Sequence, residues 1–202
     1  MIIEFLLIGL MQLLTGAVAQ NRGFSFEPPT QRIYYANHTS HLDTLIIWGL
    51  IPRSQRKHVR PVAAKDYWWA SWWRRFLAER VFHAIPVVRH RESFHEDPLH
   101  DLETALAQGE SLILFPEGTR GTGQNIQPFK SGLYHLAVKH PAIVLVPVYI
   151  DNLNRVLPKG ELIPVPVFCT VSFGSGFTLK EGETKADFTA RAQSRLQALA
   201  AP

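Results

Sequence analysis

Short apolar runs of β-favouring residues alternate along the chain with longer segments of helical spacing. The runs typical of strands are 32–36, 59–64, 81–88, 111–115, 143–150 and 169–173. Helical patterns lie between most of these runs, over 40–50, 66–79, 96–108 and 130–140. The apolar stripe that predicts a closing helix consists of Phe188, Ala192, Leu196 and Leu199. This alternation predicts an α/β fold, a single domain with a central, largely parallel mixed β-sheet flanked by helices.

The most apolar stretch precedes this pattern and covers residues 2–19. As a helix it would be ~27 Å long, against a hydrocarbon core of ~30 Å. Glu4 and Gln12 weaken a full span, so we favour an uncleaved helix that dips into a membrane or anchors to it. A signal peptide ending in the Ala-Val-Ala at 17–19 and an ordinary core helix remain as alternatives.

The segment 21–30 contains a glycine and two prolines, which is typical of a connection between the N-terminal helix and the globular domain. The chain is therefore divided into an N-terminal apolar membrane-associating helix over 1–20 and a globular domain over 21–202. Its length of 202 residues, with 46% hydrophobic and 19% charged residues, excludes disordered, collagen-like and cysteine-rich classes. The single cysteine, Cys169, cannot form an internal disulfide, which suits a reducing compartment.

Basic residues gather in two clusters although the net charge is only +4. One cluster covers 53–60 and the other covers 74–80, beside a run of aromatic residues. Such clusters attract nucleic acid or anionic lipid, and they also occur as ordinary solvated faces. No nucleic-acid-binding motif accompanies them, so nucleic acid is not expected as a partner.

The aromatic run 66–76 contains four of the five tryptophans. On one helix the broad aromatic stripe would consist of Trp68, Trp69, Trp72, Trp73 and Phe76. Tryptophan beside arginine is typical of a membrane-interface helix, while the same rings could also form core. The membrane interpretation predicts that at least two of the four tryptophans are exposed.

The first junction with chemical potential follows the predicted strand 32–36. His38 would lie at the mouth of the sheet, and Asp43 would lie in the first turn of the next helix. When one imidazole nitrogen donates a hydrogen bond to a carboxylate, the other nitrogen is left unprotonated and can take a proton from a hydroxyl. Ser40 and Asp43 also match a capping box, which would explain the acid without chemistry. The nearby His41 suggests metal ligands, but the spacing fits no zinc motif, so no metal is expected.

The second junction follows the predicted strand 111–115. The sequence Phe-Pro-Glu-Gly-Thr-Arg-Gly-Thr-Gly at 115–123 combines three glycines with an acid and an arginine. Such a turn lets backbone approach a ligand closely, and Arg120 offers a forked donor suited to phosphate. A plain surface turn is the alternative.

Together these motifs resemble one family. The pattern consists of Asn-His-x-x-x-x-Asp at 37–43, Phe-Pro-Glu-Gly-Thr-Arg at 115–120, Pro-Phe-Lys-Ser-Gly at 128–132 and Val-Pro-Val at 146–148. It resembles the 1-acyl-glycerol-3-phosphate acyltransferase family over roughly residues 32–150. The resemblance implies an enzyme that transfers a fatty acyl group from acyl-CoA or acyl-carrier protein to a glycerol hydroxyl. No cofactor beyond that acyl thioester co-substrate is expected.

The resemblance also implies roles for individual residues. His38 would be the general base, and Asp43 would orient it for direct attack without an acyl-enzyme. Backbone N–H groups around Glu117 and Gly118 would be candidates to stabilise the oxyanion of that reaction. The substrate-binding residues would be Glu117, Gly118, Thr119, Arg120, Lys65 and Arg89. Arg120 is the clearest of these for binding phosphate, whereas the motif around Arg89 lacks its usual glycine and acid.

The expected partners are therefore a membrane lipid surface, acyl-CoA or acyl-carrier protein, and a lysophospholipid acceptor. The expected location is the cytoplasmic face of a membrane, as a monotopic protein or one with a single N-terminal anchor. Other acceptors, such as another lysophospholipid or a lipoamino acid, remain open. So does a thioesterase or esterase, although Gly174-Ser175-Gly176 lacks the spacing of a nucleophile elbow. A membrane-binding protein without catalysis is disfavoured by the presence of both His38 and Asp43.

Overall fold

A computed structural model describes residues 2–88, 99–123, 125–153 and 168–200. Its centre is a seven-stranded sheet with the strand order β1-β7-β6-β2-β5-β3-β4. The strands are β1 (Val18–Arg22), β2 (Arg32–Ala36), β3 (Val59–Ala64), β4 (Ile85–Val87), β5 (Ser111–Leu114), β6 (Val144–Asp151) and β7 (Thr170–Gly174). All neighbouring pairs are parallel except β6 and β7, which are antiparallel. The predicted α/β fold with a largely parallel mixed sheet is therefore confirmed.

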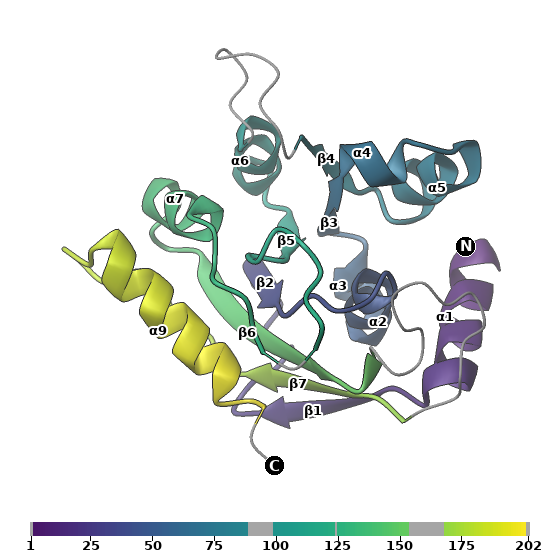
Figure 1. The fold of residues 1–202 in the computed structure, drawn as a ribbon. Coiled ribbons are helices and arrows are strands. Elements are labelled where there is room, and N and C mark those ends of the chain that lie inside the picture. The colour runs from purple at the N-terminus through teal and green to yellow at the C-terminus, as the bar shows by residue number, and fades with distance from the viewer. Residues whose placement is uncertain (1, 89–98, 124, 154–167, 201–202) are drawn as a thin grey trace.

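Helices cover both faces of the sheet (Figure 1). The helical elements are α1 (Ile2–Thr15), α2 (Asp43–Leu50), α3 (Arg53–Arg56), α4 (Lys65–Trp68), α5 (Trp72–Phe76), the π-helix η1 (Leu77–Val81), α6 (His100–Ala107), α7 (Gly132–Lys139) and α9 (Lys185–Gln197). Along β2, Tyr34 packs in a core with α1 and α2, while Ile33 and Tyr35 pack in a second core with α6, α7 and α9. This alternation of side chains on a strand buried on both faces produces the three layers.

The N-terminal segment differs from the prediction at its end. Helix α1 stops at Thr15, and Val18–Arg22 forms β1, a parallel partner of β7, where the sequence predicts helix up to residue 19. β1 is an edge strand whose side chains are mostly exposed, so it carries none of the apolar alternation that announces a strand. None of the helices in the described part of the chain is both long and apolar enough to cross a bilayer.

Helix α1 packs against α2 by one side only. Gly49 of α2 lets Met11 and Ile8 approach its backbone closely, and Met11 is buried. Glu4 forms an ion pair with Arg56 at 3.2 Å, and the same guanidinium donates to the carbonyl oxygens of Gly49 and Ile51 at the end of α2. One arginine of the first basic cluster is thus held within the fold, where it neutralises the acid of α1.

The aromatic run does not form the single helix predicted over 66–79. The chain breaks between α4 and α5, where Ser71 adopts an extended conformation and its hydroxyl oxygen accepts from Arg74. Ser71 is the N-cap of α5, and its extended backbone separates the two short helices, which apolar spacing alone does not indicate. Trp72 and Trp73 are 82% and 51% exposed, so the prediction of at least two exposed tryptophans is confirmed.

The predicted strand 81–88 is shortened to β4. Its first residues belong to η1 and the turn after it, where Phe82 and Ala84 donate to the carbonyl oxygens of Leu77 and Ala78. The apolar side chain of Phe82 is buried in this turn instead of on a strand. The other predicted strands and helices in the described residues occur with shifts of a few residues at their ends.

Candidate active site

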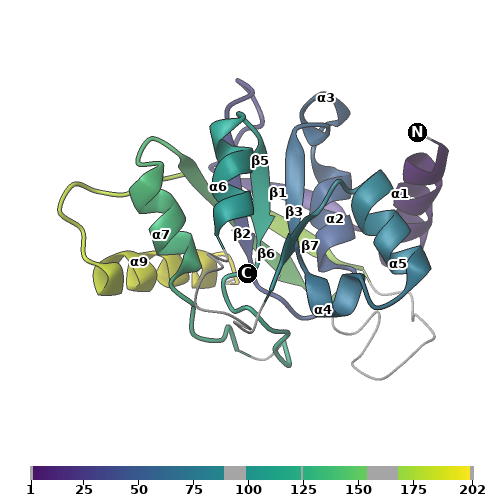
Figure 2. The ribbon, with the colours of Figure 1, turned by 90° about the horizontal axis from the view of Figure 1, so that it is seen from above.

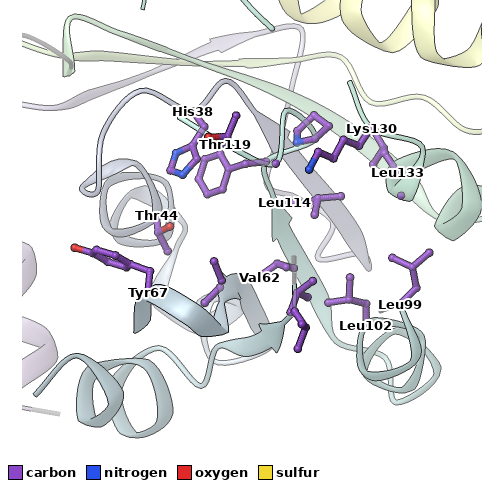
Figure 3. A pocket seen from close by; sticks show the side chains of 18 of the residues that line it. His38, Thr44, Val62, Tyr67, Leu99, Leu102, Leu114, Thr119, Lys130 and Leu133 are labelled. Atoms are coloured by element: carbon purple, nitrogen blue, oxygen red, sulfur yellow. The ribbon is translucent and has the colours of Figure 1, made fainter. Parts of the chain in front are cut away.

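A cleft of about 890 Å³ opens at the carboxyl ends of β2, β5 and β3, beside the loops that follow them. In such sheets ligands bind at this edge, because the loops diverge there. Figure 3 shows His38 and Thr119 at one side of the cleft, Lys130 and Leu133 across from them, and Leu114 between. In the view from above, α4 and α6 lie on either side of β3 (Figure 2).

The cleft divides chemically into a polar rim and an apolar floor. The polar rim includes His38, Thr119, Arg120 and Lys130. The valines and leucines of the lining, which form the apolar floor, are Val62, Val87, Val88, Leu99, Leu102, Leu114 and Leu133. A site of this composition suits a ligand with a charged end and a hydrocarbon portion.

The structure brings His38 and Asp43 into direct contact. His38 Nδ1 lies 2.8 Å from Asp43 Oδ2, and the Asp43 side chain is fully buried. Because an ionised carboxylate only accepts hydrogen bonds, this contact places the imidazole proton on Nδ1 and leaves Nε2 as a base. The His38 ring also stacks on Phe115 at a centroid distance of 4.2 Å, which fixes the ring plane.

The carboxylate of Asp43 also organises the loop that precedes α2. Its Oδ2 accepts from the backbone N–H groups of Thr39 at 2.6 Å and Ser40 at 2.9 Å. The residue at the N-cap of α2 is Leu42, and it makes no side-chain capping bond, so the Ser40–Asp43 pair does not cap the helix as a capping box would. The bonds from Thr39 and Ser40 order the turn before α2 and hold the carboxylate that contacts His38.

Glu117, which the resemblance predicts to bind substrate, is hydrogen-bonded to backbone groups through both of its carboxylate oxygens. Its side chain is buried beneath the loop and does not line the cleft. Its Oε1 accepts from the backbone N–H of His38 at 2.7 Å, and its Oε2 accepts from that of Gln127 at 2.8 Å. Burial raises the pKa of the Glu117 carboxyl, while these two hydrogen bonds act in the opposite direction.

Gly118 adopts a left-handed conformation at φ +69° with Lys130 directly against it. A Cβ at this position would lie 2.7 Å from Cε of Lys130. The glycine is favoured by its backbone angle, and the lack of a Cβ leaves room for the end of the Lys130 side chain. The N–H of Gly118 donates to the carbonyl oxygen of Phe115 at 3.0 Å and thereby closes the turn. This N–H is therefore not directed at an oxyanion, which is the role that the resemblance implies for it.

The other predicted residues are placed as follows. Thr119 and Arg120 line the cleft, while Lys65 begins α4 with an exposed side chain and is not part of the lining, although Ala64 and Asp66 are. Successive side chains leave the end of β3 in different directions, which the motif does not resolve. Arg89 lies outside the described residues.

Two lining residues received no role from the sequence. Lys130 belongs to the Pro-Phe-Lys-Ser-Gly motif, and its position beside Gly118 shows why a lysine in that motif reaches the cleft. His41 stacks on Tyr67 at a centroid distance of 4.2 Å, which separates its role from that of His38. In the described part of the chain, no group of three or more His, Cys, Asp or Glu residues could hold a metal ion.

Comparisons with known proteins identify the family of the chain. The profile of the family described as Acyltransferase matches residues 25–151. A relative from Ovis aries, 1-acyl-sn-glycerol-3-phosphate acyltransferase alpha, is 30% identical over 150 residues, covering 73% of this chain and 50% of that protein. A 1-acyl-sn-glycerol-3-phosphate acyltransferase from Cocos nucifera is 29% identical over 154 residues, with 72% and 46% covered. The chain spans about half the length of these curated relatives.

A solved structure shows the same fold. The crystal structure of the 1-acyl-sn-glycerophosphate (LPA) acyltransferase PlsC from Thermotoga maritima superposes with a TM-score of 0.79. The two chains are 18% identical, and the match covers 98% of this chain and 77% of that one. The two proteins therefore share the fold. The chain belongs to the acyltransferase family, as the resemblance indicated.

Proposed function

We propose that the chain is an O-acyltransferase that moves a fatty acyl group from an acyl thioester to the hydroxyl of a lysophospholipid such as 1-acyl-glycerol-3-phosphate. The observation that carries this proposal is the 2.8 Å contact between His38 Nδ1 and Asp43 Oδ2 at the wall of a part-apolar cleft. A thioester acyl donor, as acyl-CoA or acyl-carrier protein, is the co-substrate, and the names of the relatives support the acceptor class.

The first chemical step is removal of a proton from the acceptor hydroxyl. Nε2 of His38 takes that proton as the hydroxyl oxygen attacks the thioester carbonyl carbon directly. The carboxylate of Asp43 stabilises the imidazolium that forms, because it lies against Nδ1 and is shielded from water. Base catalysis of this kind contributes about 10²–10⁴ in rate.

The second step is collapse of the tetrahedral intermediate. Its oxyanion needs hydrogen-bond donors on the wall of the cleft. Thr119, which lines the cleft, is the candidate donor, because the N–H of Gly118 already donates to the carbonyl oxygen of Phe115. The carbon–sulfur bond then breaks, and the thiol leaves with the proton that His38 holds. The products are the acylated lipid and a free thiol, and the histidine returns to its neutral form.

The two ends of the acceptor and the acyl chain match the two parts of the cleft. Arg120 and Lys130 supply positive charge at the rim for a phosphate group. The leucines and valines of the floor supply an apolar surface for hydrocarbon, which leaves the ester-forming atoms near His38. This arrangement supports a phosphate-bearing lipid over a fully polar acceptor.

A membrane surface is the partner proposed for the side of the molecule that carries α1 and α5. Both helices lie on the same side in two views (Figures 1 and 2). Phe5 and Leu13 of α1 are 77% and 80% exposed, and Trp72 of α5 is also largely exposed. Amphipathic tryptophan next to arginine favours the lipid interface, and lysophospholipid acceptors reside there.

The proposal is tested by identifying the product. The full chain is incubated with vesicles, acyl-CoA or acyl-carrier protein carrying a labelled acyl group, and a panel of lysolipids that differ in headgroup. Mass spectrometry should find the label in the diacyl product of a phosphate-bearing lysolipid. Label released only as free fatty acid in every arm would identify a thioesterase instead, and a complete lack of turnover in all arms would also contradict the proposal.

A further inference from the structure

The catalytic loop after β2 and the glycine-rich loop after β5 are joined by a set of backbone bonds centred on His38. The N–H of His38 donates to Oε1 of Glu117 at 2.7 Å. The carbonyl oxygen of His38 accepts from the N–H of Gly121 at 2.8 Å. Both backbone polar groups of the proposed base are therefore held by the loop 117–121, in addition to the bond between its ring and Asp43.

Glu117 also connects these two loops to a third segment. Its second oxygen, Oε2, accepts from the N–H of Gln127 at 2.8 Å. Gln127 comes just before the motif that carries Lys130, whose own N–H donates to the carbonyl oxygen of Pro116. Two N–H groups from separate segments converge on one buried side chain, and an ionised carboxylate satisfies both because each of its oxygens accepts.

The location of Glu117 separates it from a substrate contact. Its side chain is 4% exposed and is not part of the lining of the cleft, whereas its neighbours Gly118, Thr119 and Arg120 are. A buried carboxylate with both oxygens bound to backbone has its acceptor capacity directed into the protein.

We infer that Glu117 is a positioning residue, which fixes the backbone of His38 so that the ring meets both Asp43 and the reacting hydroxyl. This inference deepens the proposed function and rests on it for the role of His38. It replaces the substrate-binding role that the sequence motif suggested for Glu117. Because a displacement of about 1 Å at a catalytic group can cost 10²-fold in rate, the effect is expected in turnover and not in affinity.

The test compares Glu117→Gln with a matched control. The amide of the glutamine has one acceptor oxygen, so its NH₂ group faces one of the two backbone N–H donors. Glu110→Gln makes the same change in a residue that precedes the same strand, β5, at its other end, where the glutamate accepts from Arg60 at 2.7 Å. Glu117→Asp keeps the charge but shortens the side chain, and it serves as a second variant if the glutamine variant does not fold.

Two readouts are measured for each folded variant. The first is steady-state acyl transfer, where kcat of Glu117→Gln should fall about 10- to 100-fold with KM for donor and acceptor within about twofold. The second is the NMR signal of the Nδ1–H of His38 in ¹⁵N-histidine-labelled protein, assigned by its loss in His38→Ala. This signal should shift or broaden in Glu117→Gln and stay unchanged in Glu110→Gln.

Several outcomes would overturn the inference. A raised KM for the acceptor with kcat unchanged would make Glu117 a substrate-binding residue. An unchanged kcat and an unchanged NMR signal would remove its role altogether. If the wild-type chain transfers no acyl group, the proposed function fails, and the NMR signal alone then decides whether Glu117 positions His38. If Glu117→Gln unfolds, a folded Glu117→Asp that keeps the wild-type kcat and signal contradicts the inference.

Discussion

At the scale of single residues, the site depends on how many groups hold one imidazole. The ring of His38 is fixed by Asp43 through Nδ1 and by Phe115 through stacking. Its backbone is fixed by Glu117 and Gly121. Restraints from four side chains or segments reduce the ordering that binding and reaction would otherwise require, which is how a preformed base contributes to rate.

Arg120 gives a prediction about binding at this scale. Arg120→Ala should raise KM for a phosphate-bearing acceptor about 10-fold or more, because a hydrogen bond to a charged group contributes about 1.5–3 kcal/mol. The value of kcat should change much less, since the phosphate lies away from the reacting bond. Steady-state kinetics with varied lysolipid measure both constants.

The control for that experiment is Arg53→Ala, which removes an exposed arginine of α3 outside the cleft lining. An acceptor KM that stays at the wild-type value in Arg120→Ala would count against a phosphate site at Arg120. An equal rise in KM in both variants would indicate general attraction of the lipid by surface charge.

The sequence identifies residues whose chemistry is visible in their type and spacing. His38 and Asp43 are found because only a few arrangements let an imidazole and a carboxylate five positions apart meet, and a strand-to-helix turn is one of them. The environment of Glu117 is not visible in this way, since burial and backbone partners depend on where Gln127 returns in the fold. Lys130 is likewise placed by Gly118, a contact twelve positions away in the chain.

At the scale of elements, the segment α4–α5 has two different roles. Trp68 and Trp69 are bound to the rest of the fold. The Nε1–H of Trp69 donates to Glu79 of η1 at 2.9 Å, and the ring of Trp68 packs against Phe82. Trp72 and Trp73 remain exposed on α5. Exposed large aromatic side chains in one short helix form a surface that suits an interface of lipid and water.

Replacing the two exposed tryptophans gives a prediction for this element. Trp72→Ala combined with Trp73→Ala should weaken binding to anionic phospholipid vesicles about 10-fold or more, because burying each large apolar side chain contributes about 1.5–3 kcal/mol. The thermal unfolding midpoint should change little, since neither ring is in the core. Sedimentation with vesicles of defined composition measures the partition.

Val138→Ser is the matched control, because Val138 is an exposed apolar residue of α7, on another side of the molecule from α5 (Figure 1). Vesicle binding that falls equally in this control, or does not fall in the tryptophan variant, would remove α5 from the proposed membrane surface.

Element types are predicted from sequence better than element ends. The buried strands β2, β5 and β6 are predicted from their continuous apolar runs, which arise because both faces of the sheet are covered. β1 is missed since an exposed edge strand has no apolar face to display. The break at Ser71 is missed because it lies in the extended backbone of one residue, which apolar periodicity does not record.

At the scale of the whole molecule, the sheet explains why motifs about seventy residues apart form one site. β2 and β5 are parallel neighbours, with Tyr35 beside Leu114, so the residues that follow both strands emerge together. β3 lies on the other side of β5 and brings α4 to the same edge. The topology of the sheet thus brings the proposed base, the cleft and the aromatic segment to one edge.

The N-terminal helix completes this arrangement. α1 packs against α2, the helix that begins with Asp43, and lies on the same side of the molecule as α5 (Figure 1). The division at residue 20 into a membrane-associating helix and an acyltransferase domain stays a prediction. The packing of Met11 and the pairing of Glu4 with Arg56 show only that the helix is integrated with the sheet and its helices.

The central claim is that His38, and not its neighbour His41, is the base for acyl transfer. The most direct measurement compares the rates of lysolipid acylation by His38→Ala and His41→Ala, with thermal unfolding to confirm that both are folded. The account predicts a loss of about 10²–10⁴ for His38→Ala and a much smaller change for His41→Ala, whose ring packs on Tyr67. An active His38→Ala beside an inactive His41→Ala would contradict it.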